Sequence, residues 1–155
     1  MTTATLKYSL WALGAVLLQM LIFRHLRFFG AEPDFVLLYL IWIIARNDRT
    51  TALYHAAGMG LFIDVLLDLW GLNLLTKVAI VFLAYNFIPK ETESKLLLSQ
   101  VFMLILLVAF FHNLIFLGVT NFAQSRVDLI FWNVLLGNTL FTSIIGSFIY
   151  LFKSN

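Results

Sequence analysis

Along the chain, long hydrophobic runs alternate with short polar segments, and the runs have the length of membrane-crossing helices. A helix needs about 20 apolar residues to cross the hydrocarbon core of a bilayer. The pattern therefore predicts an all-α, polytopic membrane protein, with residues 1–155 forming a single domain of six transmembrane helices. The expected spans are residues 8–28, 34–46, 52–70, 72–88, 96–118 and 129–152.

The second run is short. Its apolar part, Phe35 to Ala45, covers about 17 Å at 1.5 Å per residue, against a hydrocarbon core of about 30 Å. Pro33 and Asp34 stand at its start, where proline fits the first helical turn and a carboxylate favours the helix N-terminus. We predict a helix that begins there and thins the bilayer, borrows flanking turns or is re-entrant.

Two carboxylates interrupt the third apolar run. Wound as a helix, this run has one face of small and acidic residues and an opposite face of large apolar ones. The small face consists of Ala56, Ala57, Gly60, Asp64, Asp68 and Gly71. Such a face lets a neighbouring helix approach closely and hides the acids inside a bundle. The alternative is that one or both aspartates lie near the helix end and reach headgroup water, since Trp70 and Gly71 are typical of an interface.

The cost of burying an acid decides what we expect of this stretch. An unpaired aspartate at the centre of a membrane helix costs about 2.5 to 3.5 kcal/mol, so Asp64 should lie against a partner such as Asn73 or Lys77. A short turn places Lys77 near Asp64 and Asp68 as a candidate counter-ion; the alternative is a snorkelling surface lysine. Asp64→Asn should then be mild and Asp64→Leu costly, whereas Asp68, closer to water, should tolerate both changes.

The last two helices carry isolated polar groups. A lone histidine such as His112 is more typical of a hydrogen-bonded packing residue than of a ligand or proton carrier. Asn138, Thr142 and Gly146 follow at four-residue spacing, a small and polar stripe of the kind that joins membrane helices. Between these helices, residues 120–128 are expected to form a loop.

Composition narrows the class of protein. Hydrophobic residues make up 62% of the chain and charged residues 12%, whereas about a quarter of the residues in soluble domains are charged. Six spans leave almost no extramembrane domain, so function resides in the bundle or its short loops. There is no cysteine, which excludes disulfides, thiolate metal sites and cysteine nucleophiles. No basic patch for nucleic acid is present.

Lysine and arginine are divided unequally between the two sides of the predicted bundle. If the chain crosses the membrane six times, six of the ten lysine and arginine residues lie on the side of the two termini and four lie on the other side. Positive residues favour the cytoplasmic side. The cytoplasmic group is Lys7, Arg46, Arg49, Lys90, Lys95 and Lys153, so both termini are predicted to be cytoplasmic.

The sequence carries no motif for enzymatic chemistry. It has no glycine-rich phosphate loop, no HExxH and no GxSxG. His55 and Asp64 are nine positions apart on one predicted helix, too far to share a metal without other ligands. The pair Asp64 and Asp68 lacks a nucleophile, metal or substrate pocket. We therefore expect no catalytic residue, no cofactor and no metal.

Several short features occur in a distinctive order. A Pro-Asp-Phe turn opens a short second span, a basic turn follows, and then come a G-x-x-x-D pattern, a Gly-Leu turn and an Ala-Tyr pair. The residues are Pro33, Asp34, Phe35, Tyr39, Trp42, Gly60, Asp64, Gly71, Leu72, Ala84 and Tyr85. This order resembles the MreD family of rod shape-determining membrane proteins, by motif over about residues 30–88 and by span pattern over the whole chain. Leu67 and Asp68 depart from the small residues usual there, so Asp68 inherits no family role.

The resemblance implies a six-helix fold like that of the substrate-binding (S) component of energy-coupling-factor transporters. It also implies a non-catalytic scaffold of the bacterial cytoplasmic membrane, acting in rod-shape determination and lateral peptidoglycan synthesis. Its partners would be an MreC-like protein and, indirectly, the MreB cytoskeleton, RodA and a penicillin-binding protein. Structural or partner-contact candidates are Pro33, Asp34, Gly60, Asp64, Asp68, Gly71 and Lys77.

A second function shares the implied fold. A substrate-binding membrane component of a vitamin transporter would need an outward-facing pocket lined by several convergent polar or aromatic groups. The predicted outer loops are short, and the polar groups visible near them are mainly Asp34, Asp64, Asp68, Asn73 and Lys77. Co-purification with partners distinguishes the two functions.

Overall fold

The structure is a computed structural model that describes residues 3–25, 30–91, 96–124 and 131–154. Six α-helices and one short 3₁₀-helix make up the elements of these residues, which confirms the all-α prediction. They are α1 (Thr3–Leu21), η1 (Phe23–His25), α2 (Phe35–Arg46), α3 (Arg49–Leu67), α4 (Leu72–Ala84), α5 (Leu98–Gln124) and α6 (Phe131–Ser154).

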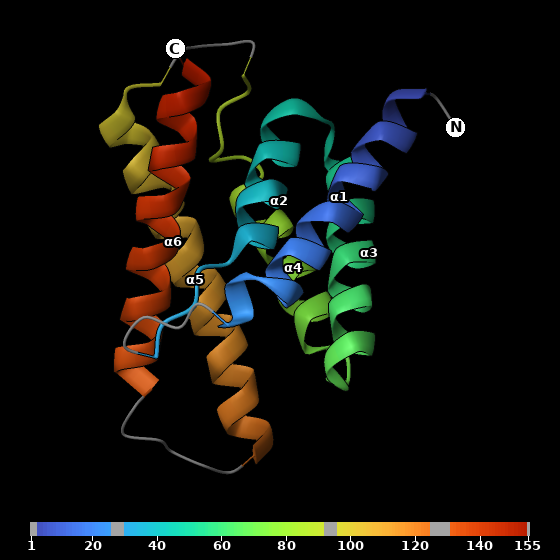
Figure 1. Cartoon of the computed structure of the whole chain (residues 1–155), viewed down its shortest axis with the longest axis vertical. Coiled ribbons are helices and arrows are strands. Elements are labelled where there is room, and N and C mark those ends of the chain that lie inside the picture. Colours follow the sequence, from blue (N-terminus) through green and yellow to red (C-terminus); the bar gives the residue numbers. More distant parts are fainter. Residues whose placement is uncertain (1–2, 26–29, 92–95, 125–130, 155) are drawn as a thin grey trace.

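The helices form two groups with α2 between them (Figure 1). Helices α5 and α6 pack against each other on one side, and α1, α3 and α4 lie on the other, where α4 also contacts α5. The start of α1, the end of α6 and the turn between α2 and α3 lie at the same end of the bundle, and the turn between α3 and α4 lies at the opposite end (Figure 1).

Three of the described helices are long and apolar enough to cross a membrane: Arg49–Leu67, Leu98–Phe122 and Phe131–Phe152. Helices α2 and α4 are apolar but have only 12 and 13 residues. The chain is therefore a membrane protein, and the count of six crossings stays a prediction.

Helix α2 lies at the centre of the bundle. It is apolar on nearly every side, as is typical of a helix buried in a protein core or in lipid. Five of its side chains have no exposed surface: Val36, Leu37, Leu40, Ile43 and Ile44. Large apolar side chains on the outer helices, such as Leu75 and Phe82, point outward instead, as they do in proteins that face lipid.

The helix boundaries differ from prediction at several places, among them α3, which begins and ends three residues before the predicted 52–70. Helix α1 ends at Leu21, and residues 26–29 of the predicted first span lie outside the described residues. Helix α4 ends at Ala84, four residues before the predicted end, and residues 85–87 form turns ahead of the proline at position 89. The predicted loop 120–128 is wrong in its first part: α5 continues to Gln124, since this polar stretch contains neither glycine nor proline to end a helix.

Side-chain contacts connect the C-terminal end of α2 to the chain that follows α4. Arg46 and Glu91 form an ion pair. The Lys90 ammonium donates to the carbonyl oxygens of Ile44 at 2.6 Å and Asn47 at 2.9 Å, and so binds carbonyls that the helix leaves unpaired at its C-terminus.

Helix α3 begins beside these contacts, and an aspartate caps its N-terminus. The hydroxyl and the backbone N–H of Thr51 both donate to the Asp48 carboxylate. These hydrogen bonds, the hydroxyl first, hold the pKa of Asp48 below its usual value. The cap fixes the direction in which α3 leaves α2.

Candidate functional site

The chain enters α2 through an extended segment, Ala31 to Asp34, and side chains from other helices satisfy its backbone. The Gln19 amide of α1 binds it twice: Nε2 donates to the Pro33 carbonyl at 2.9 Å, and Oε1 accepts from the Phe35 N–H at 2.8 Å. Non-helical backbone within a membrane protein is stable only where protein groups satisfy it. The Gln19 side chain therefore satisfies this segment where helical hydrogen bonds are absent, and the three alternatives for how α2 meets the bilayer stay predictions.

Helix α6 holds the same segment from the other side. Asn138 Oδ1 accepts from the Glu32 N–H at 2.8 Å, and Thr142 Oγ1 accepts from the Asp34 N–H at 3.0 Å. One turn further on, a Cβ added to Gly146 would lie 2.6 Å from a methyl group of Leu38. The predicted role of this stripe in joining helices is confirmed.

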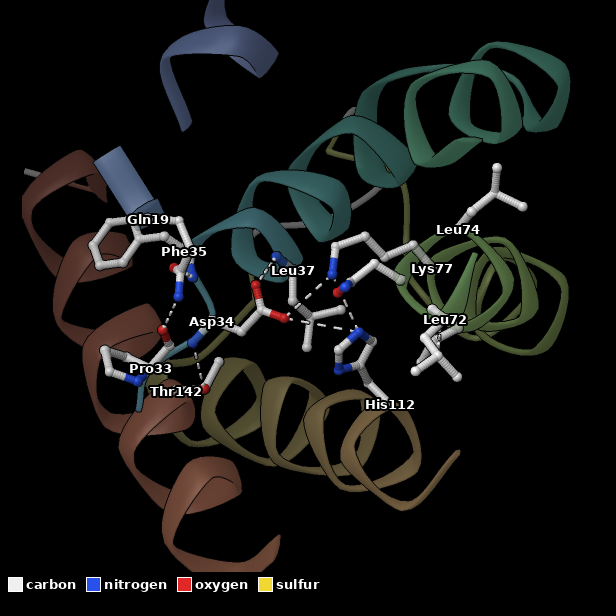
Figure 2. A network of polar contacts seen from close by, with 12 residues as sticks. Gln19, Pro33, Asp34, Phe35, Leu37, Leu72, Leu74, Lys77, His112 and Thr142 are labelled. Atoms are coloured by element: carbon white, nitrogen blue, oxygen red, sulfur yellow. Dashed lines mark hydrogen bonds and ion pairs between the residues drawn. The ribbon is translucent and has the colours of Figure 1, made fainter. Parts of the chain in front are cut away.

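Three ionisable side chains meet where the extended segment ends (Figure 2). Asp34 Oδ2 lies 3.5 Å from Lys77 Nζ of α4 and 3.7 Å from His112 Nε2 of α5. Lys77 Nζ and His112 Nε2 are 3.4 Å apart. Asp34 also caps α2, because its Oδ1 accepts from the Leu37 N–H at 2.8 Å. The triad thus joins α2, α4 and α5.

These contacts change two expectations. Lys77 is paired with Asp34 rather than with Asp64 or Asp68, and a snorkelling surface lysine is excluded because the Lys77 side chain is only 1% exposed. Asp34 is the N-cap residue of α2 and Pro33 precedes it, so the proline does not occupy the first turn as predicted. His112 is a buried residue with a hydrogen-bonding contact, as the sequence favours, but no sequence signal placed it beside Asp34.

A polar cavity adjoins the triad. Its volume is about 220 Å³. Asp34, Lys77 and His112 line it together with the amides of Asn73 and Asn138. The cavity therefore gathers hydrogen-bonding groups from four elements in the interior of an otherwise apolar bundle.

Asp64 has a different role from the triad. Its Oδ1 accepts from the backbone and side-chain N–H groups of Asn73 at 2.9 and 3.0 Å, and its Oδ2 accepts from the Leu74 N–H at 2.9 Å. These donors belong to the first turn of α4, whose own N-cap residue, Gly71, has no side chain to bind them. Asp64 is therefore a capping residue supplied by the preceding helix, and the expectation that it pairs with Asn73 is confirmed.

Gly60 allows this cap to form. A Cβ at position 60 would lie 2.5 Å from Leu74 Cα, 2.7 Å from Leu74 N and 2.9 Å from the Asn73 carbonyl carbon. Only glycine lets the backbones of α3 and α4 approach so closely. The four-residue spacing of Gly60 and Asp64 puts the close contact and the cap on the same face of α3.

The turn between α3 and α4 separates the two predicted acids. Asp68 ends α3 in a left-handed conformation, with a φ of 53°, and is exposed. Gly71 has a φ of 83°, a value that glycine adopts without strain. Asp64 is buried within the bundle and Asp68 lies at its end, so each of the two alternatives holds for one aspartate.

Substitutions at the two aspartates should differ in effect. Asp64→Leu removes the acceptor of three donors and should cost about 2 kcal/mol of unfolding free energy. Asp64→Asn should cost about 1 kcal/mol, because its amide keeps one acceptor but sets an N–H against that of Leu74. Asp68→Asn should change stability by less than about 0.5 kcal/mol, because the side chain is exposed and asparagine also adopts the left-handed conformation. Thermal unfolding of the purified protein in detergent measures all three, and equal losses at both positions would contradict the capping role.

The side chains of the site make contacts that hold helices together. Within residues 3–25, 30–91, 96–124 and 131–154, no cluster of three or more His, Cys, Asp or Glu side chains could hold a metal ion. Gln19, Asn138, Thr142 and Asp64 bind the backbone of a neighbouring element. The site therefore positions helices relative to one another.

Comparison with known proteins adds the identity of the family. No curated protein and no solved structure matches the chain. The family model described as rod shape-determining protein MreD matches residues 3–154, nearly the whole chain. Pro33, Asp34, Gly60 and Asp64, on which the resemblance rested, all lie in the extended segment and in the joint between α3 and α4. The chain belongs to the MreD family of rod shape-determining proteins.

Proposed function

We propose that this protein is a non-catalytic scaffold of the bacterial cell-elongation machinery. The observation that carries the proposal is the family match over residues 3–154, which supports a role in rod-shape determination. The finer role is to assemble with an MreC-like protein and, through it, with the MreB cytoskeleton, RodA and a penicillin-binding protein during lateral peptidoglycan synthesis. The use of Gln19, Asn138 and Asp64 to join helices agrees with a scaffold.

The proposal includes the location of the chain. We place it in the bacterial cytoplasmic membrane with both termini in the cytoplasm, on the strength of the unequal distribution of lysine and arginine. In Figure 1 the start of α1 and the end of α6 lie at the same end of the bundle. Reporter fusions after Lys7 and after Lys153 should give the same cytoplasmic signal, and opposite signals would contradict this orientation.

A transporter role is the competing function. The polar cavity beside Asp34 and Lys77 is a feature that a substrate-binding component of a vitamin transporter would also need. The family match does not favour this role, and the likeness to the S-component fold stays a prediction.

Purification of the tagged chain from native membranes distinguishes the two functions. An MreC-like protein should be recovered with it, and depletion of the chain should turn rods into round cells that the wild-type copy restores. Recovery of an energy-coupling ATPase module and a bound vitamin, without any MreC-like protein, would overturn the proposal. Asp68→Asn, at an exposed position whose left-handed conformation asparagine also adopts, serves as the control that should retain both recovery and shape.

A further inference from the structure

Helices α1 and α3 form the two walls of an open groove, which we call the α1/α3 groove. Its volume is about 440 Å³, and Ala12, Val16, Gly58 and Phe62 are among the residues that line it. The lining positions recur every three or four residues along both helices, so each helix contributes one continuous face. The groove lies on the side of the bundle away from α5 and α6 (Figure 1). Two such faces form the seam into which a third helix packs.

A buried hydrogen-bond acceptor lines the groove. His55 Nδ1 lies 2.9 Å from the Thr51 carbonyl oxygen, and because a carbonyl only accepts, Nδ1 carries the proton and Nε2 is left as an acceptor. His55 is 7% exposed, and its Nε2 has no hydrogen-bond partner among the described residues. Within a bilayer there is no bulk water to supply the missing donor.

Gly58 is the second observation that points to a partner protein. A Cβ at this position would meet no atom within 4 Å, whereas a Cβ at Gly60, two residues later, would strike the backbone of Leu74. Glycine inside a helix is less favourable than alanine, and no contact in the described chain requires it at position 58. A glycine on an exposed helix face lets the backbone of a neighbouring membrane helix approach closely.

We propose that the α1/α3 groove is the docking surface for one transmembrane helix of a partner protein. That helix packs a small residue against Gly58 and donates a hydrogen bond from a hydroxyl, amide or indole group to His55 Nε2. A lipid acyl chain can fill the groove but has no donor. A second copy of this chain is a further candidate occupant, and the cross-linking experiment below distinguishes it from a different protein. The assignment of the partner as the MreC-like protein rests on the proposed function.

Cross-linking from a single cysteine tests the location. The chain contains no cysteine, so Tyr54→Cys and Gly118→Cys can each carry a benzophenone maleimide in native membranes. Tyr54 lines the groove but is 75% exposed, so a probe there leaves the contact at Gly58 open, and Gly118 of α5 is the control because it is also exposed and lies outside the groove. Irradiation should give an adduct of this chain with the MreC-like protein at position 54 and not at position 118.

Two pairs of variants test the contacts. Gly58→Leu fills the groove and should lower recovery of the partner at least tenfold, whereas Gly118→Leu should leave it unchanged. His55→Leu should lower recovery about tenfold, the change that corresponds to a loss of about 1.4 kcal/mol. His55→Gln, which keeps an acceptor near Nε2, should restore recovery to within about threefold of wild type. Thermal unfolding of each variant shows that the chain itself is folded.

The outcomes separate this inference from the proposed function. No protein adduct at position 54, equal adducts at 54 and 118, or an adduct of two copies of this chain would overturn the docking surface. Recovery of the MreC-like protein with cross-links only elsewhere would overturn the groove and leave the scaffold role standing. An adduct at 54 with a different protein, mapped to a membrane-crossing helix with a donor side chain and lost in Gly58→Leu, would support the groove and overturn the MreC assignment.

Discussion

Lys77→Met should destabilise the folded protein by about 3 kcal/mol. The substitution keeps an apolar side chain of similar length but leaves the Asp34 carboxylate without its ammonium partner at 3.5 Å. Removal of one member of a buried ion pair costs about 3 to 5 kcal/mol, and we expect the lower value because the Asp34 side chain is 21% exposed to the adjoining cavity. Thermal and denaturant unfolding in detergent, followed by tryptophan fluorescence, measures the loss.

A double variant shows whether the unpaired charge is the cause. Asp34→Asn removes the charge and keeps an oxygen that can accept from the Leu37 N–H, so Lys77→Met combined with Asp34→Asn should be more stable than Lys77→Met alone. Such a rescue is a coupling energy between residues in contact. Additive losses from the two substitutions would mean that Lys77 contributes by packing and not by charge.

Gly60→Ala should cost about 3 kcal/mol or more, although it adds a single methyl group to a helix. The new Cβ would lie 2.5 Å from Leu74 Cα, and because the obstacle is backbone, α3 and α4 must move apart. That movement costs about 1 to 3 kcal/mol for overpacking, and it also draws the Asp64 carboxylate away from the Asn73 and Leu74 N–H groups, each bond contributing about 1 kcal/mol.

Gly14→Ala is the matched control for this substitution. Gly14 lies on an exposed part of α1, and a Cβ there would meet nothing within 4 Å. Alanine should be neutral or stabilising at this position by up to about 1 kcal/mol, because it favours the helix. Unfolding of the two variants under the same conditions, together with recovery of rod shape in cells, gives the comparison. Similar stability of both would show that α3 and α4 do not need close contact at Gly60.

The helices themselves could be predicted from the sequence, because apolar runs in a membrane must form helices to satisfy their backbone. The cost of burying an acid predicted a partner for Asp64, such as Asn73 or Lys77, and the structure shows Asn73. The small face that includes Gly60 predicted the close approach of a neighbouring helix. These residues lie on two helices joined by a short turn, so local geometry was enough to bring them together.

What the sequence could not determine is which polar groups meet across helices that are distant along the chain. Asp34, Lys77 and His112 belong to three different elements, and only the packing of α2 between the two helix groups brings them together. The extended segment could not be predicted either, because its backbone is hydrogen-bonded by Gln19 and Asn138 from helices on either side. Local apolarity determines where helices form. The pairing of buried polar groups depends on how those helices pack, so only the tertiary structure decided which groups are paired.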